Sequence, residues 1–219
     1  MNSDIKNLPD LIASKEAPRG YDQMYWKAEK ALGRYKLSAM TLDQIASLQM
    51  KMKPYGSTAS GRYQFIRATF DETRSAMGLP KDTVWTPEVQ DNMAMHLLNK
   101  RGLTKFLAGD ISRIEFANNL AKEWASLPVV TAIRGHRRLV VPGESYYAGD
   151  GLNKAFHKPE KILMAIDAIQ GQPVVIPPVP VPVPTQPSVI SEGLQRLVFT
   201  IFAFVIIVSI IVAVYYMWK

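Results

Sequence analysis

The C-terminal run of this 219-residue sequence is the feature that most constrains its fold, because residues 197–217 carry no charge. As a helix this run, LVFTIFAFVIIVSIIVAVYYM, would be roughly 31 Å long, which matches the hydrocarbon core of a bilayer. A buried core helix is the competing interpretation, but this run is longer than most helices of soluble domains and has no polar face. The sequence therefore predicts a single transmembrane helix over residues 195–218, in which Arg196 and Lys219 bracket the uncharged run.

A proline-rich segment precedes the apolar run. The sequence PVVIPPVPVPVPTQP at 173–187 favours extended polyproline II, which makes a semi-rigid spacer. A ligand for an SH3 domain is the competing interpretation, but the flanking arginines of such ligands are missing. We therefore expect one folded domain over residues 1–172, a spacer over 173–190 and then the membrane helix.

The charge of the chain lies mostly in the first domain. The whole chain carries +7, and the only charges beyond residue 172 are Glu192, Arg196 and Lys219, which leaves +6 before it. A basic domain favours a polyanionic partner. The densest basic cluster is RGHRR at 134–138, which is more typical of a solvated loop than of a nucleic-acid site, so we expect no nucleic-acid partner.

Cysteine is absent from the sequence, which excludes disulfides and cysteine-ligated metals. The three histidines, His96, His136 and His157, are far apart and lack the spacing of a metal-binding pair. We expect neither a metal nor another cofactor.

Helical patterns dominate the first domain. Thr41 and Gln44 form a capping-box pattern, and Thr86 followed by Pro87 marks a second helix start. The fold class expected is α+β, mainly helical with a small β-hairpin over 54–64. The helices are predicted at 8–16, 41–52, 65–77, 86–101, 111–127 and 160–169.

Four segments together carry a resemblance to a known family. They are LIASKEAPRGYD at 11–22, STASGRYQFIRATFDETRSAMGL at 57–79, KEWASLP at 122–128 and SYYAGDGLNKA at 145–155. In this order and spacing they resemble the phage lambda lysozyme family, in its phage and prophage muramidase branch. The resemblance covers about residues 5–170 and implies a lysozyme-like domain that cleaves peptidoglycan.

The resemblance implies that Glu16 is the catalytic acid. Glu16 ends an apolar helix, so partial burial could raise its pKa and keep it protonated. Without the resemblance, an ordinary surface glutamate would be the simpler interpretation. One departure lies beside it: the family has serine immediately before the glutamate, whereas Lys15 stands between Ser14 and Glu16 here.

The same resemblance implies that substrate is bound around the GRYQ motif. The glycine of this motif is expected to let a sugar approach the backbone. Arg62 has an alternative role as a structural ion-pair residue. The predicted substrate-binding residues are Tyr21, Asp22, Ser60, Arg62, Tyr63, Gln64 and Tyr146.

The carboxylates favour one of two chemistries. Another class of phage lysozymes has an aspartate nine residues after the glutamate, and this sequence has Tyr25 there. A single glutamate suffices for a lytic transglycosylase, which cleaves the β-1,4 bond between N-acetylmuramic acid and N-acetylglucosamine and closes a 1,6-anhydro ring. A hydrolase remains the alternative and needs a second carboxylate. The candidates are Asp22, Asp71, Glu72 and Asp150.

The expected partners are peptidoglycan and a membrane, with a holin or a virion membrane as further candidates. We expect a single-pass, tail-anchored protein of the host inner membrane or of the virion membrane, which acts on periplasmic peptidoglycan during lysis or entry. A non-enzymatic, membrane-tethered wall-binding protein is the alternative from another class.

Overall fold

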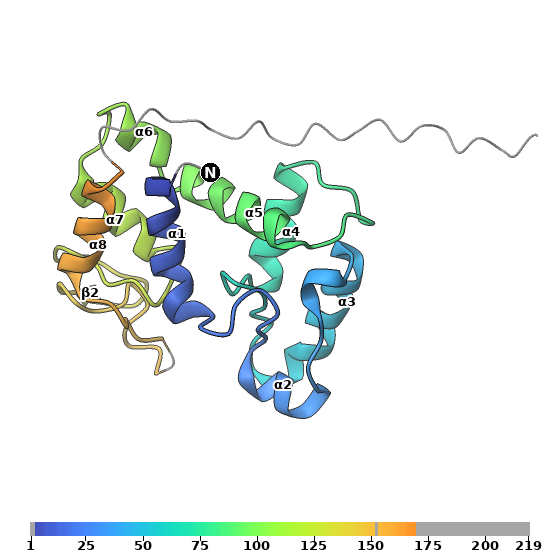
Figure 1. The fold of residues 1–219 in the computed structure, drawn as a ribbon. Helices are drawn as coiled ribbons and strands as arrows, with labels where there is room; N and C mark the ends of the chain where they lie inside the picture. Colours follow the sequence, from blue (N-terminus) through green and yellow to red (C-terminus); the bar gives the residue numbers. More distant parts are fainter. Residues whose placement is uncertain (1–2, 152, 170–219) are drawn as a thin grey trace, which may run out of the picture. The chain divides into compact units, whose positions relative to one another are not determined.

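The computed structural model describes residues 3–151 and 153–169, and these form a mainly helical domain (Figure 1). The predicted spacer at 173–190 and the predicted membrane helix at 195–218 lie outside these residues. The α-helices are α1 (Ser3–Glu16), α2 (Trp26–Leu32), α3 (Leu42–Met52), α4 (Arg67–Ala76), α5 (Pro87–Lys100), α6 (Leu103–Leu107), α7 (Arg113–Ala121) and α8 (Pro159–Asp167). Short 3-10 helices span Leu37–Ala39 and Lys53–Tyr55.

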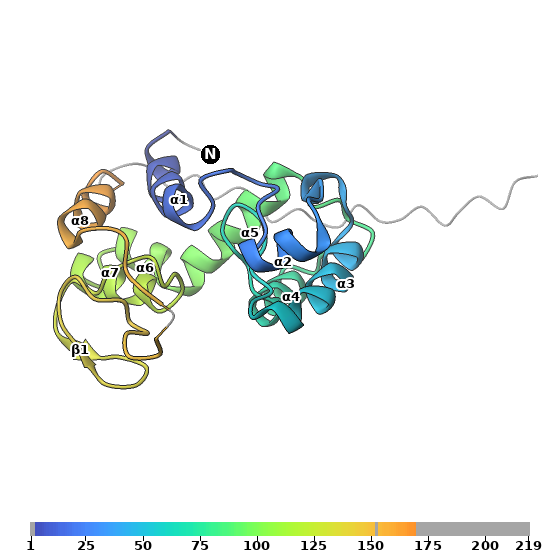
Figure 2. The same ribbon diagram turned by 90° about the horizontal axis from the view of Figure 1, so that it is seen from below.

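Most helices pack against their neighbours in the chain, and α1 closes the arrangement. Helix α3 packs against α4, α4 against α5, α5 against α6, α6 against α7 and α7 against α8. Helix α1 contacts both α8 and α5, so the N-terminal helix is held between the central helix and the last one (Figures 1 and 2). The end of α1 therefore has its place fixed by contacts from distant parts of the chain.

Aromatic side chains pack against one another in the core of the domain. Trp85 is fully buried, with its ring edge-on to Phe65 at 6.0 Å and to Phe70 at 5.3 Å between centroids. A second aromatic pair, Phe106 and Phe116, stacks at 5.2 Å and joins α6 to α7. Edge-to-face and stacked pairs of this kind add stability beyond their burial.

The predicted helix starts are confirmed. The Thr41 hydroxyl accepts from Gln44 N, and the Gln44 side chain accepts from Thr41 N, which is a complete capping box. Thr86 caps α5 by accepting from Val89 N, with Pro87 in the first turn. Helices α2 and α6, which are short, were not predicted.

The small sheet lies at a different place in the sequence from the one predicted. A mainly helical fold with one two-stranded antiparallel hairpin is confirmed, but β1 (Ile133–Arg134) pairs with β2 (Leu139–Val140) rather than within 54–64. The segment predicted as a hairpin makes isolated antiparallel bridges instead, from Ser60 to Phe65 and to Met24, and the Gln49 side chain adds hydrogen bonds to it.

The helix predicted over 111–127 is also shorter than expected. Helix α7 ends at Ala121, and residues 122–127 form turns, with Trp124 N bonded to Leu120 O and Leu127 N bonded to Trp124 O. This change matters for the site, because the turns bring Ser126 toward the end of α1.

Within residues 3–151 and 153–169, no helix has the length and apolar character needed to cross a membrane. This finding contradicts the localisation predicted above, a single-pass, tail-anchored membrane protein. That prediction rested on the length and hydropathy of one run, 197–217, which lies outside the described residues.

Candidate active site

Glu16 is the last residue of α1 and lies half-buried against the turn that follows α7. The apolar side of α1, with Leu8, Ile12 and Ala13, is buried in the core and fixes the rotation of the helix. That rotation carries the Glu16 carboxyl group toward Ser126, whose N–H donates to Glu16 Oε1 at 3.4 Å.

Burial controls the acidity of Glu16. It raises the pKa of this carboxyl group above its ordinary value, and hydrogen bonding from the Ser126 side chain and N–H only partly opposes the effect. The Ser126 hydroxyl is itself buried and lacks a hydrogen bond of normal geometry, although it is close enough to influence the carboxyl group. A carboxyl group with a raised pKa keeps its proton to higher pH, which is what a general acid needs.

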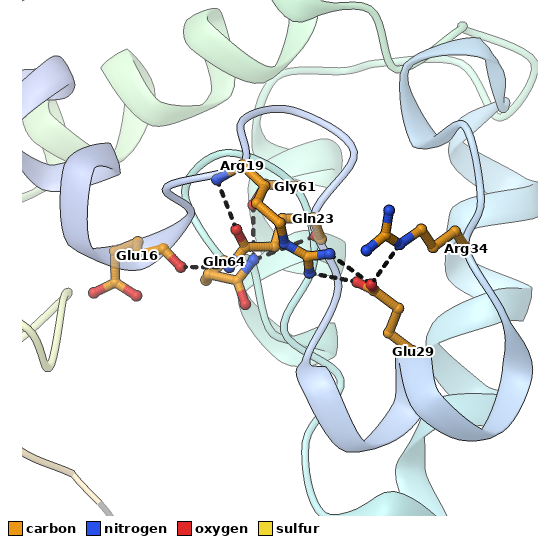
Figure 3. A network of polar contacts seen from close by, with 7 residues as sticks. All are labelled: Glu16, Arg19, Gln23, Glu29, Arg34, Gly61 and Gln64. Carbon is orange, nitrogen blue, oxygen red and sulfur yellow. Dashed lines mark hydrogen bonds and ion pairs between the residues drawn. The ribbon is translucent and has the colours of Figure 1, made fainter.

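Gln23 joins the end of α1 to the GRYQ motif (Figure 3). Its Nε2 donates to Glu16 O at 3.2 Å, and its Oε1 accepts from Arg19 N at 3.0 Å. Its own carbonyl accepts from Gly61 N at 2.8 Å and from Gln64 Nε2 at 3.3 Å. Figure 3 shows the Glu16 carboxyl group pointing away from this network. The network therefore holds the backbone of Glu16 and does not contact its carboxyl group.

The loop at 57–66 is held from beneath by α3. Gln49 is buried, and its Nε2 donates to Thr58 O at 3.2 Å, to Ser60 Oγ at 2.9 Å and to Phe65 O at 2.9 Å. One side chain thus sets the shape of the loop, which is a common task for a buried amide.

Gly61 is required by packing. Its φ is +77°, and a Cβ there would lie 2.5 Å from Trp85 and 2.6 Å from Gln90 Oε1. The sequence suggested that this glycine opens the backbone to a sugar, whereas the structure places the core against it. Gln90 adds to this by accepting from Arg62 N at 2.9 Å.

The motif side chains Arg62 and Tyr63 form a cluster between α1 and α5. Arg62 pairs with Asp10 at 2.5 Å and lies over the ring of Tyr21, 5.0 Å from its centroid. The Tyr63 hydroxyl donates to Asp91 Oδ1 at 2.8 Å, and Tyr21 donates to the same carboxylate at 3.1 Å. Burial raises the pKa of Tyr63, which keeps its hydroxyl protonated as a donor.

The cluster has consequences for the predicted binding residues. Tyr63 is only 3 % exposed and Ser60 is fully buried, so their burial favours an indirect contribution to binding. Arg62 has the ion pair that was its alternative role. Gln64 is half-buried beside Gln23 and has the positive φ of +49°, a strained conformation for a residue other than glycine. Their roles in substrate binding stay predictions.

Asp22 and Tyr146 lie in other surroundings. Asp22 accepts from Ser38 N at 2.7 Å and pairs with Lys36 at 3.2 Å. Burial works to raise the pKa of Asp22, but these hydrogen bonds outweigh it and the pKa is lowered. Tyr146 follows β2 and packs edge-on against Tyr147, with ring centroids 5.2 Å apart.

The other candidate second carboxylates also have partners. Asp71 pairs with Arg67 one turn earlier on α4, and Glu72 pairs with Lys100 at 2.5 Å. Asp150 accepts from Asn153 N at 2.8 Å. Each of these carboxylates is thus engaged with its own neighbours.

Several residues that shape the site were not predicted. Gln23, Gln49, Gln90 and Asp91 are polar residues in ordinary helical or loop patterns, and Ser126 lies inside the WASLP segment. Only the KEWASLP resemblance pointed to Ser126. Among the described residues no group of three histidine, aspartate or glutamate side chains could hold a metal ion.

Comparison with known proteins places these residues in a family. Residues 13–140, more than half of the chain, match the family model described as Endolysin, and this range contains Glu16, the GRYQ motif and Ser126. The Endolysin of Escherichia phage lambda is 36 % identical over 87 residues, which are 39 % of this chain and 49 % of that protein. The chain thus spans about half the length of this curated relative, and no solved structure gives a significant match.

The resemblance to the phage lambda lysozyme family is confirmed by these matches, and of the four segments the one at 145–155 lies outside residues 13–140. The residues that build the end of α1 and the loop beneath it lie inside the matched range. The chain therefore belongs to the endolysin family.

Proposed function

We propose that this protein is a phage enzyme that degrades peptidoglycan, with Glu16 as its general acid. The observation that carries the proposal is the half-buried carboxyl group of Glu16 at the end of α1, which faces Ser126 N within the range that matches the endolysin family. Burial there raises the pKa of Glu16. A catalytic acid must hold its proton until the leaving group takes it, and burial supplies that property here.

The bond proposed for cleavage is the β-1,4 bond from N-acetylmuramic acid to N-acetylglucosamine. Glu16 gives its proton to the glycosidic oxygen as the bond to the anomeric carbon breaks. The resulting carboxylate then takes the proton of the 6-hydroxyl of the same muramic residue, and that oxygen bonds to the anomeric carbon. The products are a free 4-hydroxyl and a 1,6-anhydro end; no water is consumed and Glu16 regains its proton.

The engaged carboxylates support this transglycosylase course over hydrolysis. An inverting hydrolase needs a second carboxylate as base, and a retaining one needs it as nucleophile. Asp22 is paired with Lys36 and bonded to Ser38, so activating a water would require it to leave those partners. Hydrolysis of the same bond remains the second candidate.

A wall-binding protein without activity is the candidate from another class. Such a protein has no use for a half-buried acid, because burying a carboxyl group without need reduces stability at neutral pH. A role in lysis or in entry, and a holin or a virion membrane as partner, stay predictions.

The test uses the full chain on purified peptidoglycan, with release of soluble fragments as the measurement. Mass spectrometry then separates the two chemistries, because each anhydro fragment is one water lighter than its hydrolytic counterpart. Reducing muramic ends as the main product would replace the transglycosylase by a hydrolase. Absence of soluble fragments over a range of pH and salt would contradict the enzyme itself.

A further inference from the structure

A pocket of about 600 Å³ lies between the segment that follows α1 and one face of α2. Its α2 side comes from residues 26, 29 and 30, which share one face of the helix, and from Gly33 directly after the helix. The pocket is wide open to solvent and not enclosed. Its lining includes Arg19, Gln23, Trp26, Glu29, Lys30 and Arg34.

Trp26 gives the pocket an exposed aromatic surface. It is 62 % exposed, whereas Trp85 and Trp124 are buried in the core. The ring has Tyr25 at 6.2 Å and the ammonium group of Lys27 at 5.5 Å from its centroid. An exposed indole is typical of a binding surface, because its face can stack on the apolar face of a ligand ring.

The pocket also carries an excess of positive charge. Arg19 makes two hydrogen bonds to Glu29, at 2.6 and 2.5 Å, and Arg34 makes one to the same carboxylate at 3.0 Å. Lys30 adds a third cation on the same face of α2. One carboxylate offsets one of these three cations, so an anionic group would be attracted to the pocket.

Gln23 connects the pocket to the candidate active site. It lines the pocket, and the same side chain donates to the carbonyl of Glu16 (Figure 3). Arg19, three residues after Glu16, is bonded through its N–H to Gln23 Oε1. A ligand in the pocket would therefore lie next to the segment that carries the acid.

We propose that this pocket binds the N-acetylmuramyl peptide unit of the wall, with its sugar ring against Trp26 and the peptide carboxylates at Lys30 and Arg34. The inference rests on the proposed function and adds a substrate preference to it. Glycan strands that carry acidic stem peptides are cleaved in preference to bare strands. A bare strand carries only the lactyl carboxylate next to each muramic ring, whereas a stem peptide adds carboxylates that can reach Lys30 and Arg34.

The first experiment compares two substrates for the full chain: strands with stem peptides, and strands from which an amidase has removed them. We expect kcat/KM to be about tenfold higher on the peptide-bearing strands, the effect of one charge-assisted contact. Lys30→Glu should abolish that preference, so that kcat/KM becomes about equal on the two kinds of strand.

Lys51→Glu is the matched control, because it makes the same change in net charge on an exposed lysine of α3 outside the pocket. It should behave as the parent chain on both substrates. Equal kcat/KM of the parent on the two substrates, or an equal loss in Lys30→Glu on both, would overturn the inference while the proposed function stands.

The second experiment measures binding without turnover. Tryptophan fluorescence of Glu16→Gln is titrated with N-acetylmuramyl dipeptide and, separately, with an uncharged N-acetylglucosamine tetramer. We expect the dipeptide to change the emission and to bind at least about fivefold more tightly than the tetramer, and the change should vanish when Trp26→Phe is added.

The two experiments separate the possible failures. A chain that binds the dipeptide through Trp26 but releases no fragments from any wall would contradict the proposed function and not the pocket. Tighter binding of the uncharged tetramer would mean a neutral sugar site and would overturn the inference. An emission change that persists in the Trp26→Phe variant would do the same.

Discussion

Two groups of polar residues near the GRYQ motif differ in how completely their hydrogen bonds are satisfied. In the cluster of Arg62, Tyr63, Tyr21, Asp10 and Asp91, the charged and hydroxyl groups have partners inside the domain. At the end of α1, the Glu16 carboxyl group has one long bond from Ser126 N, and the Ser126 hydroxyl has none of normal geometry. This difference fits the proposed function, in which Glu16 is the acid and the motif mainly holds the surrounding backbone in place.

This comparison is tested most strongly at Glu16. Glu16→Gln keeps the size and hydrogen bonding of the side chain but removes its proton, so fragment release should fall by at least about a hundredfold. A Glu88→Gln variant, which changes an exposed carboxylate in the first turn of α5, should keep full activity.

The stability of Glu16→Gln gives an independent measurement. The pKa of Glu16 is raised above 4.5 in the folded state. Below the pKa of the unfolded state, Glu16 is protonated in both states and does not reduce the free energy of unfolding. As pH rises through the folded pKa, the ionised carboxylate reduces that free energy. At neutral pH the variant should therefore unfold at the same or a slightly higher temperature. A lower unfolding temperature would mean that the carboxylate stabilises the fold, against the comparison.

Gly61→Ala tests the scaffold directly. The alanine would need a left-handed backbone and would press on Trp85 and Gln90, so we expect a loss of about 2–4 kcal/mol in unfolding free energy, measured by denaturant titration. Gly78→Ala is the control, because its φ is +62° but no atom lies within 4 Å of the added Cβ. An equal cost in both variants would show that backbone strain alone explains Gly61.

Tyr63→Phe removes one hydroxyl from the satisfied cluster. The buried Asp91 bond is lost, and unfolding free energy should fall by about 1 kcal/mol, while activity per folded molecule stays within about twofold. The exposed Tyr35→Phe should change neither quantity. A large loss of activity at unchanged stability would make Tyr63 a direct substrate contact and break the comparison.

Ser126→Ala should have the smallest effect. The Ser126 side chain lowers the pKa of Glu16, so its removal lets burial raise that pKa further. Activity that needs protonated Glu16 falls as pH rises through the pKa of Glu16. In Ser126→Ala this fall in activity should therefore occur at a higher pH. Ser14→Ala, two residues from Glu16 on an exposed side of α1, should leave the pH profile of fragment release in place. A shift to lower pH in Ser126→Ala would contradict the assignment.

Helix starts were predictable because they depend on neighbours in the sequence. The capping box at Thr41 and Gln44 needs three residues of separation, and the start at Thr86 needs only the proline after it. Helix α2 was missed because its sequence, WKAEKAL, makes only about two turns and has one buried residue, which gives little periodicity. The end of α7 was missed because the turns after it depend on contacts with other parts of the domain.

By itself the sequence determined a mainly helical domain of the endolysin family with a glutamate at the end of its first helix, since helix patterns and ordered motifs are properties of the chain. The tertiary structure decided the burial and the hydrogen-bond partner of that glutamate. Ser126 is 110 residues away in sequence, and it meets Glu16 only because α1 is held between α5 and α8. Burial, the partner of each motif hydroxyl and the packing at Gly61 all arise from such distant contacts, which no local pattern encodes.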